Sequence, residues 1–192
     1  MKKQAIFIGS SVCVGSGATD NRGWAAITAE RMREDGWSTS NCAIGGQTTA
    51  DILLRLERDV IDHQPDLCFV GLGLANEGLP GAEGVQCEII RGIFESNLRK
   101  IVSALTRSGI RPVLGGVYPN NRYTPEQYAT LQDCRAEMSR WFVPVLDWLP
   151  RIDDGYGHFR PGYSFDAGHP NDAGYAAMAK AVDAELWRGE ML

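Results

Sequence analysis

Paired cysteines are absent from this sequence of 192 residues, in which no Cys-x-x-Cys motif occurs. The five cysteines are odd in number and far apart, at positions 13, 42, 68, 87 and 134. This spacing excludes a zinc site built on cysteine pairs and a thioredoxin-like redox motif. Cys42 and Cys68 lie in apolar runs, which predicts buried free thiols and a reducing compartment.

Positive charge and long apolar runs are also scarce. The formal net charge is -5 at pH 7 and Lys2-Lys3 is the only adjacent lysine pair, so the basic patch typical of nucleic-acid binding is missing. No stretch approaches the roughly 18 apolar residues of a membrane span. The apolar run at residues 5–8 is shorter than the roughly seven residues of a signal-peptide core. We therefore expect a cytoplasmic protein without a nucleic-acid partner or a membrane span.

Short apolar runs alternate with segments of helical period along the chain. Strands are expected at residues 5–8, 37–42, 67–72, 112–117 and 143–146, and helices at 24–33, 49–61, 89–108, 125–141 and 171–187. This alternation predicts an α/β fold, a three-layer α/β/α sandwich around a five-stranded parallel sheet. No repeat, linker or low-complexity tract interrupts the pattern, so residues 1–192 are expected to form a single domain.

Several loops with chemically useful residues follow the predicted strands. The turn at Gly9, the pair Gly45-Gly46 and residues 73–76 come after the first three strands in turn. In open α/β sheets, ligands bind outside the carboxyl ends of the strands. The loop at residues 166–171 can reach the same edge, where we therefore expect the functional site.

The turn after the first strand carries candidate nucleophiles. A serine between a strand and a helix exposes its hydroxyl above the sheet, and the helix N-terminus favours developing negative charge. Ser11 is the first choice, Ser10 is the alternative and Ser16 is a more distant one. A glycine-serine turn without any chemistry would have a similar sequence.

A carboxylate lies three residues before a histidine near the end of the chain, at Asp166 and His169. Such a carboxylate can orient the histidine as the general base of a serine hydrolase. A surface loop before a helix that starts near Pro170 is the alternative. The other histidines are weaker candidates, because His63 follows an amphipathic helix and His158 lies in a glycine-rich loop.

Two residues are candidate donors to an oxyanion, which need to lie about 2.7–3.1 Å from it. Gly46 offers a backbone N–H without a side chain in the way, and Asn76 offers a side-chain amide just after a buried strand. Glycine pairs and asparagines also mark ordinary turns. The order of the candidates along the chain therefore carries more information than either donor alone.

Four segments of the chain resemble the signature blocks of the SGNH (GDSL-type) hydrolase family, at residues 8–12, 41–49, 71–76 and 166–171. The last block is the most specific, and Gly174-Tyr175 after it also fits the family. The resemblance spans nearly the whole chain and implies the flavodoxin-like topology of SGNH hydrolases.

The resemblance implies a role for each candidate residue. Ser11 would be the nucleophile and, through its backbone N–H, an oxyanion donor. Gly46 and Asn76 would complete the oxyanion hole. His169 would be the general base, and Asp166 would orient it.

Two positions depart from the family's pattern. Ser10 stands where the first block usually has an aspartate between the glycine and the nucleophile. Glu77 follows Asn76 where an aspartate is more common. The first departure bears on the geometry of the turn and on which serine attacks, more than on the class of reaction.

The resemblance implies a serine esterase that works through an acyl-enzyme, with no metal and no cofactor. We expect a small acyl ester as substrate, and an acetyl ester on a carbohydrate is the favoured case. Residues 76–86 and the aromatic-rich residues 148–165 are expected to shape the pocket. The aromatic rings suit stacking on sugars, but packing of the loop onto the sheet is the favoured interpretation.

Other functions remain open from the sequence. A lysophospholipase or thioesterase would belong to the same family. A flavodoxin-like binding module would use residues 9–18 to hold a phosphate at a helix N-terminus, but would leave Asp166 and His169 without a role. A relative without catalytic activity that only binds glycans is a third alternative, suggested by Ser10.

Overall fold

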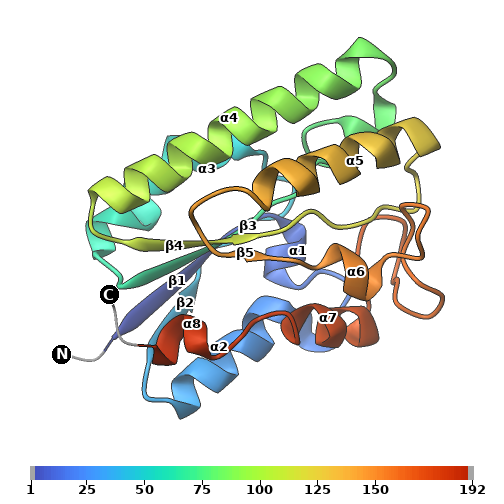
Figure 1. Ribbon diagram of the computed structural model, residues 1–192. Helices are drawn as coiled ribbons and strands as arrows, with labels where there is room; N and C mark the ends of the chain where they lie inside the picture. Colours follow the sequence, from blue (N-terminus) through green and yellow to red (C-terminus); the bar gives the residue numbers. More distant parts are fainter. Residues whose placement is uncertain (1–2, 190–192) are drawn as a thin grey trace.

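Five parallel strands form the centre of the structure, a computed structural model that describes residues 3–189 (Figure 1). The strands lie in the order β2-β1-β3-β4-β5. Their bounds are Gln4–Gly9 (β1), Ser38–Asn41 (β2), Leu67–Gly71 (β3), Arg111–Gly115 (β4) and Val145–Leu146 (β5). Strand β3 is buried along its whole length, as its continuous apolar run predicts, whereas the edge strand β2 is polar and largely exposed.

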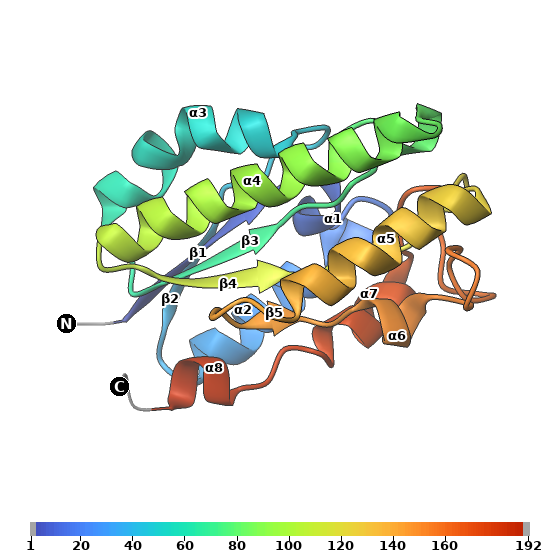
Figure 2. The ribbon, with the colours of Figure 1, turned by 45° about the horizontal axis from the view of Figure 1, so that its top comes forward.

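Helices cover both faces of the sheet, which confirms the expected three-layer sandwich (Figures 1 and 2). One layer contains α3 (Thr49–Asp59), α4 (Val85–Arg107) and α5 (Pro125–Met138). The other contains α1 (Ser11–Val14), α2 (Trp24–Glu34), α6 (Leu149–Ile152), α7 (Asp172–Ala179) and α8 (Glu185–Arg188). Short 3-10 helices occur at η1 (Thr19–Asn21), η2 (Ile61–His63) and η3 (Leu79–Gly81). Within residues 3–189, no helix combines the length and the apolar character that crossing a membrane requires.

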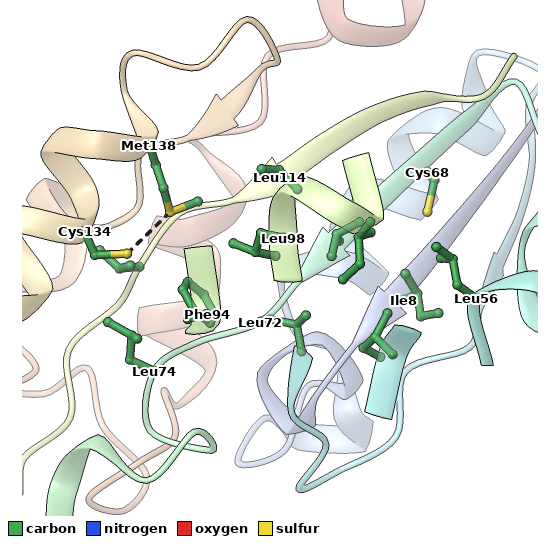
Figure 3. Close-up of a cluster of buried hydrophobic side chains, with 14 of the residues drawn as sticks. Ile8, Leu56, Cys68, Leu72, Leu74, Phe94, Leu98, Leu114, Cys134 and Met138 are labelled. Atoms are coloured by element: carbon green, nitrogen blue, oxygen red, sulfur yellow. Dashed lines mark hydrogen bonds between the residues drawn. The ribbon is translucent and has the colours of Figure 1, made fainter. Parts of the chain in front are cut away.

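Each layer has its own apolar core against the sheet. In the first, Ile8 and Cys68 of the strands face Leu56 of α3 and Phe94 of α4 (Figure 3). The second core is rich in aromatic rings. Apolar burial of this extent on both faces is the main stabilising contribution to the fold.

The aromatic core centres on Phe69 of β3. Its ring stacks on that of Phe7 with centroids 4.7 Å apart and meets the edge of Trp24 at 6.4 Å. The Trp24 ring in turn lies 4.8 Å from that of Trp148. Trp148 therefore packs under the sheet, as the favoured interpretation of the aromatic-rich segment predicts.

The five cysteines are free thiols. Cys68 is fully buried, as expected, and burial raises the pKa of its thiol. The expectation of a buried Cys42 is wrong, because this residue directly follows the edge strand β2 and is only half-buried.

Capping boxes set the start of two helices. Thr48 and Asp51 form a capping box at α3, and Thr124 and Gln127 form another at α5, which satisfies backbone N–H groups that have no partner inside the helix. Helix α4 begins at Val85, earlier than predicted, because its first turn buries a single residue, Cys87, and shows little apolar period.

The prediction of one helix over residues 171–187 is wrong, since α7 and α8 are separated by residues 180–184. Arg31 of α2 donates hydrogen bonds to the carbonyl oxygens of Ala179 at 3.4 Å and of Val182 at 3.0 Å. These carbonyl groups thereby find a partner outside the helix, and α7 ends there.

Replacing Phe69 with alanine should lower the free energy of unfolding by about 3–5 kcal/mol, because the cavity left between Phe7 and Trp24 cannot close fully. Urea denaturation measures the change. The matched control is Phe142→Ala, which removes the same atoms from a fully exposed ring and should change the stability by less than about 0.5 kcal/mol. Equal effects of the two substitutions would contradict this core.

Candidate active site

The turn after β1 places Ser11 at the carboxyl edge of the sheet. The backbone N–H of Ser10 donates to the carbonyl oxygen of Gly71 at 3.0 Å, which holds the turn against β3. Ser11 is the first residue of α1, so its own N–H has no acceptor within the helix. Ser10 is fully buried, whereas Ser11 is half-buried and lines a cavity. Burial therefore favours Ser11 over Ser10 as the residue that can meet a ligand.

A chain of hydrogen bonds joins three of the candidate residues. The Oγ of Ser11 lies 2.9 Å from Nε2 of His169. The Nδ1 of His169 lies 2.9 Å from each carboxylate oxygen of Asp166. The structure thus brings together a serine, an imidazole and a carboxylate in the order that nucleophilic catalysis requires.

The loop around Asp166 supports an ionised carboxylate. Its Oδ1 accepts the backbone N–H groups of Gly168 and His169, both at 2.8 Å. Partial burial acts to raise the pKa of Asp166, but the hydrogen bonds from the His169 ring and from Gly168 outweigh it and leave the pKa below its usual range. A carboxylate that remains charged can fix the ring tautomer and stabilise an imidazolium.

The two candidate oxyanion donors differ in their placement. Asn76 lines the cavity together with Ser11 and His169, and one N–H of its amide donates to the carbonyl oxygen of Gln47 at 3.0 Å. Gly46 has a φ of 79°, a conformation that favours glycine. It is exposed and lies outside the cavity lining, one residue before Gln47.

Helix α3 holds the loop that carries Gly46. The buried Arg55 donates through Nη1 to the carbonyl oxygen of Cys42 at 2.8 Å and through Nε to Oε1 of Gln47 at 2.6 Å. Its Nη1 also lies 2.6 Å from Asp59. The sequence analysis did not identify Arg55, because its position on an amphipathic helix looks like that of any solvated arginine.

Glu77, at the second departure from the family pattern, joins two loops of the site. Its Oε1 accepts the backbone N–H of Thr49 at 2.6 Å, next to the bond between Asn76 and Gln47. Burial raises the pKa of Glu77, while the hydrogen bond from Thr49 acts against this. The loops after β2 and β3 are therefore linked at two adjacent points.

The cavity in front of Ser11 has a volume of about 270 Å³. It is lined by Ser11, Ala75, Asn76, Pro80, Tyr118, Asn120, Arg122, Asp166, Ala167, Gly168 and His169. Tyr118, Asn120 and Arg122 were not predicted from the sequence, because the segment between β4 and α5 that contains them carries no recognised motif. A larger cavity of about 650 Å³ lies beside α5, but no histidine lines it. It therefore lacks a general base comparable to His169.

The remaining candidates lie apart from this cavity. His63 is exposed in η2, and His158 contacts the carbonyl oxygen of Tyr123 at 3.3 Å and Asp154 at 3.6 Å. The carbonyl oxygen of Ser16 accepts the Tyr175 hydroxyl at 2.7 Å. In the part of the chain that the structure describes, no group of three or more His, Cys, Asp or Glu side chains is placed to hold a metal ion.

The aromatic-rich segment divides into two groups. Trp148 and Phe159 are buried, whereas Tyr156 and Phe165 are exposed. None of these four rings lines the cavity. Of the two stretches expected to shape the pocket, residues 76–86 contribute Asn76 and Pro80 to its wall.

Comparison with known proteins gives a family and several similar proteins. The model of the GDSL-like lipase/acylhydrolase family matches residues 7–177. Esterase TesA of Pseudomonas aeruginosa is 26% identical over 122 residues, which cover 62% of this chain and 57% of the relative. The chain therefore spans about half the length of the curated relatives it matches.

Solved structures with the same fold cover almost all of the chain. A protein from Desulfitobacterium hafniense, described as lipolytic and of the G-D-S-L family, superimposes with a TM-score of 0.74 at 20% identity and covers 94% of this chain and 97% of its own. Axe2, an acetylxylan esterase from Geobacillus stearothermophilus, superimposes with a TM-score of 0.70 at 20% identity, covering 93% and 91%. These matches confirm the fold that the sequence predicts.

Replacing Asp59 with asparagine should weaken the support of the Gly46 loop. The hydrogen bond from Arg58, together with that from Arg55, lowers the pKa of Asp59 to about 2. The ionised carboxylate therefore stabilises the fold above the unfolded pKa of about 3.9, and this contribution is lost as the pH falls toward about 2. Asp59→Asn should lower the free energy of unfolding at pH 7 by roughly 1.5–3 kcal/mol.

Urea denaturation at a series of pH values measures this effect. The difference between parent and variant should shrink as the pH falls from about 4 toward 2. Asp62→Asn is the control, because Asp62 is exposed and forms no ion pair within residues 3–189. A difference that does not depend on pH would contradict the role of the Asp59 charge.

Proposed function

Since the chain belongs to the GDSL-like lipase/acylhydrolase family, we propose that it is a serine esterase that hydrolyses small acyl esters. The supporting observation is the chain of 2.9 Å contacts from Ser11 through His169 to Asp166. This chain opens into a cavity at the carboxyl ends of the strands, where α/β sheets bind their ligands.

Ser11, His169 and Asp166 each have one task in the reaction. With Nδ1–H donated to Asp166, Nε2 of His169 can accept the proton of Ser11 as Oγ attacks the ester carbonyl carbon. The imidazolium then protonates the leaving alcohol, and an acyl-enzyme remains on Ser11. A water molecule, deprotonated by His169, attacks the acyl carbon and releases the acid and the free serine.

The oxyanion of each tetrahedral intermediate needs preorganised donors. We assign this task to the backbone N–H of Ser11, the side-chain amide of Asn76 and the backbone N–H of Gly46. The assignment of Asn76 is supported by the hydrogen bond that its amide donates to the carbonyl oxygen of Gln47. This bond fixes the amide, and the second N–H of the same group stays available to a ligand in the cavity. Gly46 is supported by its position next to Gln47, in the loop that Arg55 holds.

The size and the wall of the cavity favour a short acyl group. Its apolar wall consists of Ala75, Pro80, Ala167 and the buried Tyr118, with no large aliphatic side chain. A long acyl chain would find little apolar surface there, which disfavours a lipid substrate. An acetyl ester on a carbohydrate is the favoured case, supported by the likeness to an acetylxylan esterase and by the exposed ring of Phe165 beside Asp166.

Substitution of the two adjacent serines tests the assignment of the nucleophile. Ser11→Ala should lower kcat for 4-nitrophenyl acetate by roughly 10⁴–10⁶-fold, because no other group can form the acyl-enzyme. Ser10→Ala is the matched control, since the Ser10 hydroxyl is buried and has no hydrogen-bond partner among the described residues. It should retain activity within about tenfold of the parent. Full activity of Ser11→Ala would refute the proposed mechanism.

The acyl chain length that the cavity accepts is a separate prediction. Among 4-nitrophenyl acetate, butyrate and octanoate, kcat/KM should be highest for acetate or butyrate and at least about tenfold lower for octanoate. The small cavity without an aliphatic wall is the reason. A steady rise of kcat/KM toward octanoate would instead indicate a lipid or long-chain thioester substrate.

A further inference from the structure

Asn120 and Arg122 line the cavity beside Ser11 and His169. The segment from Asn120 to Arg122 takes part in no step of the proposed hydrolysis. It lies between β4 and α5, where the sequence analysis assigned no function. Asn120 is only 5% exposed. A polar side chain that is buried to this extent usually has a hydrogen-bond partner for each of its polar atoms, and the Asn120 amide nitrogen has none among the described residues. This combination suggests that the segment faces a ligand.

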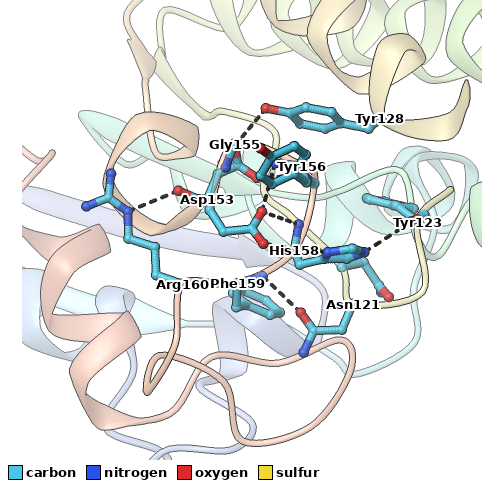
Figure 4. Close-up of polar contacts among 12 residues, drawn as sticks. Asn121, Tyr123, Tyr128, Asp153, Gly155, Tyr156, His158, Phe159 and Arg160 are labelled. Atoms are coloured by element: carbon cyan, nitrogen blue, oxygen red, sulfur yellow. Dashed lines mark hydrogen bonds and ion pairs between the residues drawn. The ribbon is translucent and has the colours of Figure 1, made fainter. Parts of the chain in front are cut away.

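Two other loops fix the backbone of this segment. The N–H of Asn120 donates to the carbonyl oxygen of Gly157 at 3.0 Å, and that of Asn121 donates to the carbonyl oxygen of Ala167 at 2.7 Å. The side chain of Asn121 accepts the N–H of Phe159 at 2.9 Å, as Figure 4 shows. The segment is therefore held on one side by residues 157–159 and on the other by the loop that carries Asp166 and His169.

The orientation of the Asn120 amide is also fixed. Its Oδ1 accepts the backbone N–H of Arg122 at 3.0 Å, so Nδ2 points the opposite way. A Cβ placed on Gly168 would lie 3.4 Å from this Nδ2, which sets the amide next to the catalytic loop. Within residues 3–189, Nδ2 donates no hydrogen bond to a protein atom, and its two N–H groups are available to the cavity.

Arg122 adds a positive charge to the same wall. Within the described residues, no carboxylate oxygen lies within 4.0 Å of its guanidinium, in contrast to Arg135 and Arg188, which form ion pairs. A guanidinium supplies up to five N–H donors and no acceptor. Arg122 is exposed and, like Arg107, forms no ion pair within the described residues. What sets it apart is its place in the lining of the cavity beside Ser11.

The cavity offers few acceptors in return. Both oxygens of Asp166 accept hydrogen bonds from His169, and one of them also accepts from Gly168. The Oδ1 of Asn120 is occupied by Arg122. A carboxylate or phosphate group needs donors only, and this wall supplies them.

We infer that Asn120 and Arg122 bind an oxyanion group of the substrate, so that the preferred substrates are small esters that carry a negative charge. This inference rests on the proposed esterase function, because the charged group must lie within one small molecule's length of Ser11. The guanidinium fork binds a carboxylate or phosphate through paired hydrogen bonds. The Asn120 amide adds a donor from the deeper part of the wall. Neutral esters of the same size lack these contacts.

Matched pairs of esters test the inference on the intact chain. On the acyl side, mono-4-nitrophenyl glutarate is compared with its methyl ester. On the alcohol side, 4-acetoxybenzoate is compared with its methyl ester, and 4-acetoxyphenyl phosphate separates a phosphate from a carboxylate preference. In at least one of these arms, kcat/KM for the charged ester should exceed that for the neutral one by roughly tenfold or more. Ser11→Ala supplies the background rate.

Variants then locate the preference. Arg122→Gln should bring the charged-to-neutral ratio of kcat/KM close to one. Asn120→Asp should do the same, since it keeps the acceptor for the Arg122 N–H but replaces the donor by a negative charge. Arg107→Gln is the matched control and should keep the parent ratio, because Arg107 is exposed at the end of α4 and forms no ion pair within the described residues.

The outcomes separate this inference from the proposed function. Hydrolysis of all the esters with a ratio near one in the parent would overturn the inference and leave the esterase function standing. A high ratio that survives both Arg122→Gln and Asn120→Asp would also overturn it. If the folded parent hydrolyses none of the esters above the Ser11→Ala background, the esterase function fails and the inference fails with it.

Discussion

The turn that carries Ser11 depends on one constraint, which is the close approach of two backbones at Gly9 and Gly71. A Cβ on Gly9 would lie 2.0 Å from the carbonyl oxygen of Gly71, and the same oxygen receives the N–H of Ser10. A Cβ on Gly71 would lie 2.8 Å from the Trp24 ring. Because no side chain fits between the ends of β1 and β3, Ser11 leaves the sheet directly at its edge. The loop that carries Asn76 begins at the same edge, one strand away.

The parts of the site that could be predicted from the sequence are those that depend on short-range chemistry. Asp166 and His169 lie in one loop whose own N–H groups bind the carboxylate, so their pairing needs little from the rest of the fold. A buried strand such as β3 could be predicted because a continuous apolar run has few alternatives in a buried sheet. The choice between Ser10 and Ser11 depends on burial, which the residue types alone do not reveal.

The features that could not be predicted depend on contacts between distant segments. Asn120 faces the cavity only because the loops after α6 and before α7 hold its backbone, and no local motif marks such a residue. Arg55 holds the loop that carries Gly46 through a hydrogen bond to the side chain of Gln47, and this contact forms only in the folded protein. The break between α7 and α8 likewise depends on Arg31, which belongs to a helix far away in the sequence.

The distribution of charge in the site gives a physical account of the serine at position 10. Ser10 is fully buried, and an ionised aspartate there would be costly without a charged partner or several donors. Burial raises the pKa of the neighbouring cavity residue Tyr118 to about 12, so its phenol stays neutral at pH 7 and, like any phenol, cannot supply the positive charge that such a carboxylate would need. A neutral serine at position 10 avoids this cost, and among the described residues that line the cavity the only carboxylate is that of Asp166. Since donors already occupy both of its oxygens, the lining presents no unpaired carboxylate to the negative charge that we expect to develop at an ester carbonyl beside Ser11.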